Sequence, residues 1–270
     1  MVKNMIYISS SKNPIIKEIK SLYKKKDRWK NKLYIIEGIK LVHEAINYGM
    51  NIKYILYTDK LLYTDEGTSF YSILSKFDNL INVPDILFEE ICGTENSQGV
   101  MAVVHFYIND TLELMNEKNK FLLYLDSLQD PGNLGTIIRS AEAFNADGIL
   151  IGKGCVDPYN PKVVRATMGS IFRIPLYFIN DYIILEELKK NNYRIYATSL
   201  EGSIPIYDVK YINNFIIAIG NESQGVKDRV LNLADASIKI PMPGSAESLN
   251  AGVAASIIMY EAMKQRGKLS

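Results

Sequence analysis

The sequence is poor in the residues that metal and disulfide sites require. It contains two cysteines, Cys92 and Cys155, and two histidines, His43 and His105, all widely separated along 270 residues. Two distant cysteines support neither a disulfide framework nor a zinc pattern. A Ser-His-Asp triad is also disfavoured, because neither histidine lies in a motif-like loop. We therefore expect a site without metal.

Long apolar runs and the familiar nucleotide signatures are lacking as well. No stretch approaches the roughly 20 apolar residues of a membrane span, and the N-terminus has no secretory signal pattern. Gly152-Lys153-Gly154 follows an apolar stretch, but Asp157 stands where a dinucleotide fingerprint needs its third glycine, and no phosphate loop is present. The sequence predicts a cytoplasmic protein of two domains, without membrane contact.

The whole chain has no large excess of positive or negative charge, but its first residues are strongly basic. The net charge is +1, yet residues 1–32 contain ten bases against two acids, a local balance of +8. A basic segment around the only tryptophan suits the phosphates and bases of RNA, although such a run is equally typical of a solvated helix face. The bases nearest Trp29 are Lys24, Lys25, Lys26, Arg28 and Lys30.

Apolar patterns alternate between strand and helix along the chain, which indicates an α/β fold. Asn13 is a plausible cap and Pro14 a plausible first residue of a helix that reaches residue 26. A polar stretch over 109–120 separates two alternating blocks. We predict an RNA substrate-binding domain over 1–108 with a mostly parallel sheet, a linker over 109–120 and a second α/β domain over 121–270.

The second block contains the predicted site. Its helix over 133–144, its turn over 220–225 and its loop over 241–250 each follow an expected strand, with a strand over 172–178 between them and a last helix opening at Ser248. The carboxyl ends of parallel strands share one edge of a sheet, where ligands bind. We therefore expect these three polar segments to converge.

Those segments also carry a resemblance. The runs NLGTIIRSAEAF, IAIGNESQGV and IPMPGSAESLNAGVAASI resemble the three motifs of the SpoU (TrmH) family of RNA 2′-O-ribose methyltransferases of the SPOUT superfamily. The stretches KNPIIKEIKSLYKKKDRW and IIEGIKLVHEA are similar to the ribosomal-protein-like RNA-binding domain of many members. The resemblance implies a deep C-terminal trefoil knot, an exception to the usual rule on threading. It further implies S-adenosylmethionine as cofactor and a homodimer formed beside the knot.

The resemblance makes Arg139 the central catalytic residue, with Asn133, Glu222, Ser248 and Asn250 around it. Because a guanidinium stays protonated, we expect Arg139 to hold a phosphate beside the reacting ribose and to stabilise the charge that develops on its oxygen. The predicted RNA-binding residues are Lys24, Lys25, Lys26, Arg28, Lys30 and Arg139. The residues implied in cofactor binding are Thr198, Ser199, Leu200, Gly220, Asn221, Glu222, Gly225, Ile240, Met242, Ser248 and Leu249.

Simpler interpretations stand beside these. Arg139 could be only solvated, Glu222 only a carboxylate favoured at a helix start, and Ser248 only an N-cap. We expect a ribosomal RNA 2′-O-methyltransferase, with transfer RNA as the nearest rival substrate. A non-catalytic RNA-binding protein of ribosome assembly is the rival from another class. The sequence does not distinguish a housekeeping enzyme from one that confers antibiotic resistance.

Overall fold

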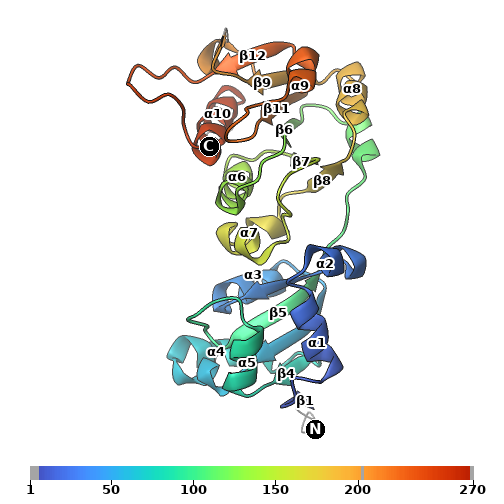
Figure 1. Cartoon of the computed structure of the whole chain (residues 1–270), viewed down its shortest axis with the longest axis vertical. Coiled ribbons are helices and arrows are strands. Elements are labelled where there is room, and N and C mark those ends of the chain that lie inside the picture. Colours follow the sequence, from blue (N-terminus) through green and yellow to red (C-terminus); the bar gives the residue numbers. More distant parts are fainter. Residues whose placement is uncertain (1–5, 202–203, 268–270) are drawn as a thin grey trace. The chain divides into compact units, whose positions relative to one another are not determined.

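The structure is a computed structural model that describes residues 6–201 and 204–267. Helices and strands gather in two compact units, each built on one sheet (Figure 1). The first unit contains the chain up to Tyr107 together with 159–172, and the second contains 108–158 and the chain from Arg173 onward. Among the helices described, none is long and apolar enough to cross a membrane.

The first unit is a five-stranded sheet with helices packed against it. Its elements are β1 (Ile6–Tyr7), α1 (Pro14–Ser21), α2 (Lys25–Asn31), β2 (Leu33–Glu37), α3 (Ile39–Asn47), β3 (Ile52–Tyr57), α4 (Asp65–Leu74), β4 (Leu80–Asn82), α5 (Asp85–Ile91), β5 (Val100–His105) and α7 (Pro161–Ala166). The strand order is β1-β4-β3-β5-β2. The apolar face of α1 is fully buried in this core through Ile16 and Ile19.

The start of α1 agrees with the prediction. The Asn13 side chain accepts a hydrogen bond from the Ile15 amide at 2.9 Å, and Pro14 is the first helical residue. The helix ends at Ser21, earlier than expected, because the chain is extended at Lys24 before α2 begins. The basic segment is therefore two short helices.

The first sheet departs from the expected parallel arrangement in one strand. β5 runs antiparallel to both of its neighbours, β2 and β3, while β1, β4, β3 and β2 run in one direction. The loop after α5 stays at the carboxyl edge of the sheet, where the Thr58 amide donates to the Gly99 carbonyl at 2.9 Å. A strand that starts at this edge has to run back across the sheet.

Residues 159–172 belong to the first unit. The predicted second domain over 121–270 is instead continuous and therefore includes them. The Tyr159 ring stacks on Phe106 at 3.9 Å between centroids and lies 5.0 Å from the Tyr34 ring. Aromatic pairs of this kind contribute about 0.5–1.5 kcal/mol beyond the area they bury. Local pattern along the chain does not reveal a contact between residues so far apart in sequence.

The second unit is a seven-stranded sheet in which every neighbouring pair is parallel. Its elements are β6 (Phe121–Leu125), α6 (Pro131–Ala143), β7 (Gly148–Gly152), β8 (Leu176–Ile179), α8 (Ile183–Lys190), β9 (Arg194–Thr198), β10 (Ile204–Pro205), β11 (Phe215–Ile219), α9 (Asp228–Leu233), β12 (Ala236–Lys239) and α10 (Ala251–Gln265). The order is β10-β12-β9-β11-β6-β7-β8, so β6 and β11 lie at the centre. Both are buried along their length, as their continuous apolar sequences predict.

Three details of the second unit differ from expectation. The strand predicted over 172–178 is β8, which begins only at Leu176. Part of the predicted linker is a 3-10 helix, Thr111–Asn116, whose Leu114 lies in the core. The last helix begins at Ala251 and not at Ser248, because Asn250 provides the cap and accepts hydrogen bonds from the next amides. The deep knot implied by the resemblance stays a prediction.

Candidate active site

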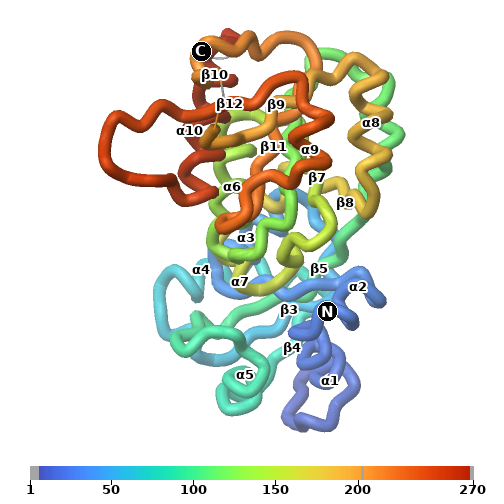
Figure 2. The backbone as a smooth tube through the Cα atoms, turned by 45° about the horizontal axis from the view of Figure 1, so that its top comes forward, coloured from blue at the N-terminus to red at the C-terminus, as the bar shows by residue number. Residues whose placement is uncertain are grey.

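The candidate site lies at the carboxyl edge of the second sheet. β6 ends at Leu125 in register with Ile219, the last residue of β11, and Thr198 of β9 pairs with Ile238 of β12. Four strands of one direction therefore end together. The connections that follow them are 126–130, 199–201, 220–227 and 240–250, and the last of these stands out as an open loop in Figure 2.

Asn133 joins the three motif segments through one buried side-chain amide. Its Nδ2 donates to Glu222 Oε1 at 2.9 Å, and its Oδ1 accepts from Asn250 Nδ2 at 2.7 Å. Asn250 in turn caps α10, where its Oδ1 accepts from the amides of Gly252 and Val253. The predicted convergence of α6, the 220–225 turn and the start of α10 is thus present.

Asn133 is placed by Asp130, which the sequence analysis did not single out. The Asp130 carboxylate caps α6 by accepting from the Asn133 amide at 2.7 Å, and Pro131 is the first helical residue. An aspartate directly before a proline is a typical helix start. This signal could have moved the predicted start of the helix from Asn133 to Pro131.

Glu222 carries a negative charge at this site. Burial by itself raises the pKa of the Glu222 carboxyl, but hydrogen bonds from Asn133 and from the backbone amides of Asp130 and Gln129 outweigh burial, so the pKa lies below its ordinary value. A carboxylate held by amide donors stays ionised at neutral pH. Glu222 therefore adds a fixed negative charge to the site, next to the Asp130 carboxylate that caps α6.

The turn that carries Glu222 is closed on itself. Asn221 and Gly225 exchange backbone hydrogen bonds at 3.0 and 2.9 Å, and the Asn221 side chain donates to the Ser127 carbonyl at 3.0 Å. A Cβ on Gly220 would come within 2.0 Å of the Gly225 backbone, so only glycine fits there. The turn is thereby held against the connection that follows β6.

The other predicted cofactor residues are distributed over the same edge. The Thr198 hydroxyl donates to the Ala218 carbonyl at 3.1 Å, and the Ser199 amide donates to the Ile238 carbonyl at 3.0 Å. Ile240 and Met242 are half-buried, whereas Leu200 and Leu249 are exposed. Ser248 is exposed in the open loop and, within the described residues, makes no hydrogen bond with the Asn133 cluster.

Arg139 is the basic residue of α6 and follows Asn133 on that helix. It is exposed, and no hydrogen bond or ion pair holds its guanidinium among residues 6–201 and 204–267. The five donors of a guanidinium suit two oxygens of a phosphate at once. Arg139 is therefore available to an anionic ligand that reaches this face of the unit.

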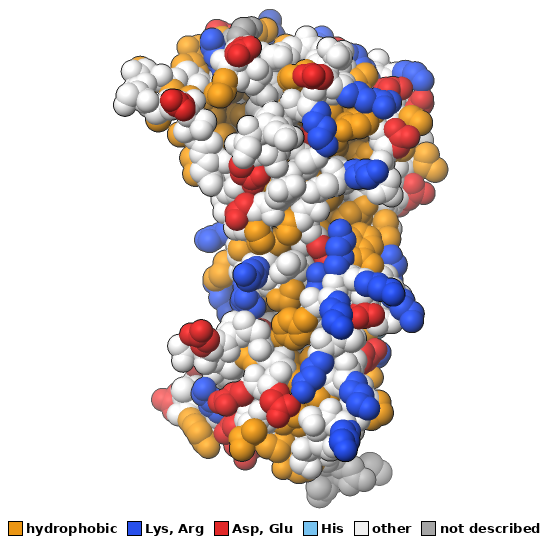
Figure 3. Space-filling view, in the orientation of Figure 1, with side chains coloured by type: hydrophobic (Ala, Val, Ile, Leu, Met, Phe, Trp, Pro, Cys, Tyr) orange, Lys and Arg blue, Asp and Glu red, His pale blue; other side chains and the backbone are white. Residues whose placement is uncertain are grey.

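In the first unit the predicted RNA-binding residues divide into two groups. Lys24, Lys25, Lys26 and Lys30 are exposed, and Lys and Arg side chains gather over α1 and α2 in Figure 3. Arg28 is instead 2% exposed and donates to the Leu22 carbonyl at 2.8 Å, so its prediction as part of that surface is corrected.

The neighbouring tryptophan also points inward. The Trp29 ring meets the rings of Phe106 and Tyr159 edge-on, at 5.4 and 6.3 Å between centroids. Seven-residue α2 buries one side against this aromatic cluster, which takes Arg28 and Trp29 out of the exposed lysine surface. Charge alone in the sequence did not reveal which side of α2 faces inward.

No metal site is evident in the part of the chain that the structure describes. Within it, no three His, Cys, Asp or Glu side chains gather in a way that could hold an ion. The two cysteines are free and half-buried.

Known proteins are similar to this chain in sequence and in fold. A family model described as the SpoU rRNA Methylase family matches residues 120–260, and one described as an MRM3-like substrate binding domain matches 13–102. The chain is 35% identical, over 95% of its length and 98% of the relative, to the 23S rRNA (guanosine(2553)-2′-O)-methyltransferase RlmP of Bacillus subtilis. It is 29% identical to a 23S rRNA (uridine(2479)-2′-O)-methyltransferase of Streptomyces viridochromogenes, over 86% of this chain and 83% of the relative.

Among solved structures, an AdoMet-bound rRNA methyltransferase from Sinorhizobium meliloti superimposes with a TM-score of 0.85. Its sequence is 30% identical, and the match covers 98% of this chain and 99% of the other. Both units of the chain are therefore present in a protein of known fold.

The lowered pKa of Glu222 predicts a pH-dependent effect of Glu222→Gln. Hydrogen bonds to the carboxylate stabilise the folded chain above the ordinary carboxyl pKa of about 4.3 and lose their effect as pH falls through the lowered folded value. The difference in free energy of unfolding between wild type and E222Q should therefore shrink when denaturant unfolding moves from neutral to acidic pH. Glu247→Gln, in the open loop, is the control and should show little difference at either pH. A difference for E222Q that is the same at both pH values would contradict the assignment.

Proposed function

Since the chain belongs to the SpoU rRNA methylase family, we propose that it methylates a ribose 2′-hydroxyl of ribosomal RNA. S-adenosylmethionine is the methyl donor, and the chain is an RNA 2′-O-methyltransferase. The observation that carries the proposal is the junction at Asn133, which joins Glu222 and Asn250 beside a helix that presents an unpaired arginine. A cytoplasmic location follows from a ribosomal substrate.

The residues of the junction suit a cationic cofactor. S-adenosylmethionine, when bound, would supply a methyl group on a positively charged sulfur, and its transfer to the ribose oxygen would leave a neutral thioether. The ionised Glu222 carboxylate complements that positive charge, and neutral amides of Asn133 and Asn250 surround it. We assign Gly220, Asn221, Gly225 and the connections after β9 and β12 to the adenosine and methionine parts.

Arg139 acts on the RNA. A ribose hydroxyl is a weak nucleophile, so catalysis requires its orientation and the stabilisation of charge that develops on its oxygen. We assign Arg139 to the phosphate next to the reacting ribose, where its field favours loss of the hydroxyl proton to that phosphate. Asn133 and Asn250 hold the surrounding loops, and Ser248 lies on the loop that would close over bound ligands.

The retained set of polar residues disfavours a non-catalytic RNA-binding protein, which would need only the lysine surface. A ribosomal substrate is favoured over transfer RNA because two relatives that match over both units are named for 23S rRNA, although others of similar coverage are named tRNA/rRNA methyltransferases. Mapping of 2′-O-methyl groups in RNA from cells with and without the protein distinguishes the two. If cells without the protein lack a 2′-O-methyl group in transfer RNA and not in ribosomal RNA, the proposed substrate is contradicted.

We predict that Arg139→Ala abolishes the chemistry but not the binding of the donor. Loss of one electrostatic group at a reacting oxygen typically costs about 10²–10³ in kcat, so kcat with 23S rRNA should fall by at least about 100-fold. The affinity for S-adenosylmethionine, measured by calorimetry, should change little. Arg139→Lys keeps the charge without the two-pronged donor and should be intermediate. A large loss of affinity for S-adenosylmethionine, or the loss of a cooperative thermal unfolding transition, would show instead that Arg139 has a structural role.

The exposed lysines of α2 and its cap predict a salt effect. The test variant changes four lysines to Gln: Lys24, Lys25, Lys26 and Lys30. The slope of log Kd for rRNA against log salt concentration should become smaller by about 0.7–0.9 for each of these lysines that contacts a phosphate. Arg28→Gln is the matched control. Since Arg28 is buried, this change should destabilise folding by about 1–3 kcal/mol and leave the slope unchanged. An unchanged slope for the lysine variant would remove this surface from the RNA path.

We further propose that the chain is a homodimer and that its C-terminal part is knotted, both as the family resemblance implies. Val253, Ile257 and Tyr260 occur at helical spacing on α10 and remain 46, 36 and 49% exposed. An apolar stripe on one helix face suits burial against a second copy. Light scattering should give about twice the 30.6 kDa chain mass, and Ile257→Asp should yield monomer. A monomeric wild type would contradict the dimer.

A further inference from the structure

We infer that the Asp126–Lys227 ion pair positions the turn of Glu222, and thereby sets the affinity for the methyl donor. The inference rests on the proposed function. Asp126 is the first residue after β6 and Lys227 is the N-cap of α9, at the far end of the connection that follows β11. Neither residue belongs to the set of catalytic and cofactor residues described above.

Asp126 is a buried charge with several partners. Its side chain is 1% exposed; its Oδ2 accepts from the Lys227 amide at 2.9 Å, and its Oδ1 lies 3.3 Å from Lys227 Nζ. Its own amide donates to the Ile219 carbonyl at 2.8 Å. A buried carboxylate is costly unless it is paired and hydrogen-bonded. Asp126 therefore fixes where the 220–227 connection ends.

Ser127 fixes the other end of that connection. It has a left-handed backbone with φ of 60°, which is uncommon for a residue other than glycine. In this conformation its carbonyl accepts from the Asn221 side chain at 3.0 Å, and its hydroxyl donates to the Lys153 carbonyl at 3.1 Å. Lys227 Nζ also donates to the Ser127 hydroxyl.

The two attachments leave little freedom for Glu222. The connection that bears it is held by Asn221 at one end and by Lys227 at the other, and both attachments lead to consecutive residues after β6. The pKa of Lys227, which burial lowers, is raised overall by the Asp126 carboxylate, so the lysine stays charged. Without the pair, Glu222 would lose its fixed distance from Asn133.

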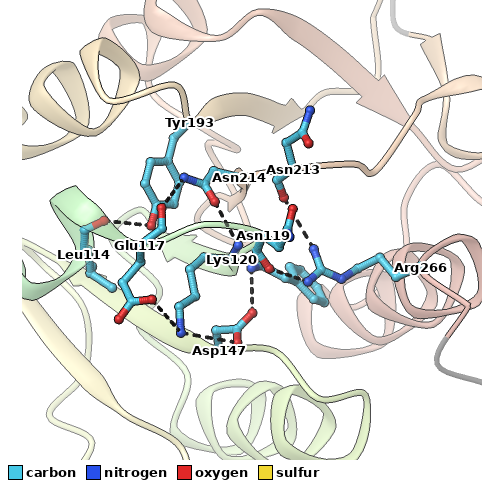
Figure 4. A network of polar contacts seen from close by, with 10 residues as sticks. Leu114, Glu117, Asn119, Lys120, Asp147, Tyr193, Asn213, Asn214 and Arg266 are labelled. Carbon is cyan, nitrogen blue, oxygen red and sulfur yellow. Dashed lines mark hydrogen bonds and ion pairs between the residues drawn. The ribbon is translucent and has the colours of Figure 1, made fainter.

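A second Asp–Lys pair on the same strand provides a matched control. Before β6, Asp147 Oδ2 accepts from the Phe121 amide at 2.7 Å, and Lys120 Nζ lies 3.8 Å from Asp147 Oδ1 (Figure 4). In both pairs a carboxylate binds a backbone amide and a lysine, but the Asp147 side chain is 25% exposed where that of Asp126 is 1% exposed. This pair lies at the amino end of β6, and Lys120 is six residues, or roughly 20 Å at about 3.3 Å per residue, from Asp126.

The experiment compares Lys227→Met with Lys120→Met in the full-length protein. The probes are S-adenosylmethionine, titrated by calorimetry, and methyl transfer from it to 23S rRNA. A displacement of about 1 Å at a reacting centre can cost 10²-fold, so K227M should raise the Kd and KM for the donor by roughly 10- to 100-fold. The KM for RNA should not change. K120M should stay within about twofold of wild type in the Kd for the donor and in both KM values.

Two further variants keep the test decisive if K227M does not fold. Asp126→Asn combined with K227M removes both charges and leaves an oxygen for the Lys227 backbone amide, and Asp147→Asn with K120M is its control. The first double variant should fold and still bind the donor weakly, whereas the second should bind it normally. Donor affinity equal to wild type in a folded D126N/K227M protein would overturn the inference. A wild type that neither binds donor nor methylates rRNA would instead overturn the proposed function.

Discussion

The site depends on the side-chain amide of Asn133, whose donor and acceptor groups both form hydrogen bonds. Asn133 donates to Glu222 and accepts from Asn250, at 2.9 and 2.7 Å. An amide is suited to this position because it has donor and acceptor groups on one rigid plane, which a carboxylate or an ammonium lacks. Because the amide is buried, any loss of a partner would leave a polar group unsatisfied, at a cost of about 1–3 kcal/mol. The three segments therefore form one cooperative unit.

That junction requires the parallel arrangement of β6, β9, β11 and β12. Parallel strands end at one edge, where the connections after β11 and β12 supply Glu222 and Asn250, and the connection after β6 leads into α6 with Asn133. The carboxyl edge thus holds a fixed negative charge, while the neighbouring helix α6 presents a free guanidinium to solvent. Opposite charges at adjacent places on one unit match a cationic cofactor on one side and a polyanionic substrate on the other.

Under the proposed function, the two units divide the work of binding by different chemistry. The first presents exposed lysines on a pair of short helices, and long-range attraction of this kind would give affinity for RNA without sequence information. The second uses buried hydrogen bonds, which fix geometry over short distances. Such a division is consistent with a reaction that needs a large folded RNA to be held while one hydroxyl is aligned.

Local pattern in the sequence was sufficient for most elements and for the convergence of the motif segments. The apolar runs of β6 and β11, the cap at Asn13 and the polar loops after each strand follow from propensity and period alone, because these are properties of neighbouring residues. The resemblance of three motifs then identified the family. What pattern could not determine was which residues face inward when distant segments pack.

Tertiary structure decided those points. It buried Arg28, turned Trp29 toward Phe106 and Tyr159, reversed β5 and brought 159–172 into the first unit. It also paired the buried Asp126 with Lys227 across 101 positions. The physical reason is common to all of them: a side chain's propensity is local, whereas its burial and its hydrogen-bond partners depend on what the fold places opposite it.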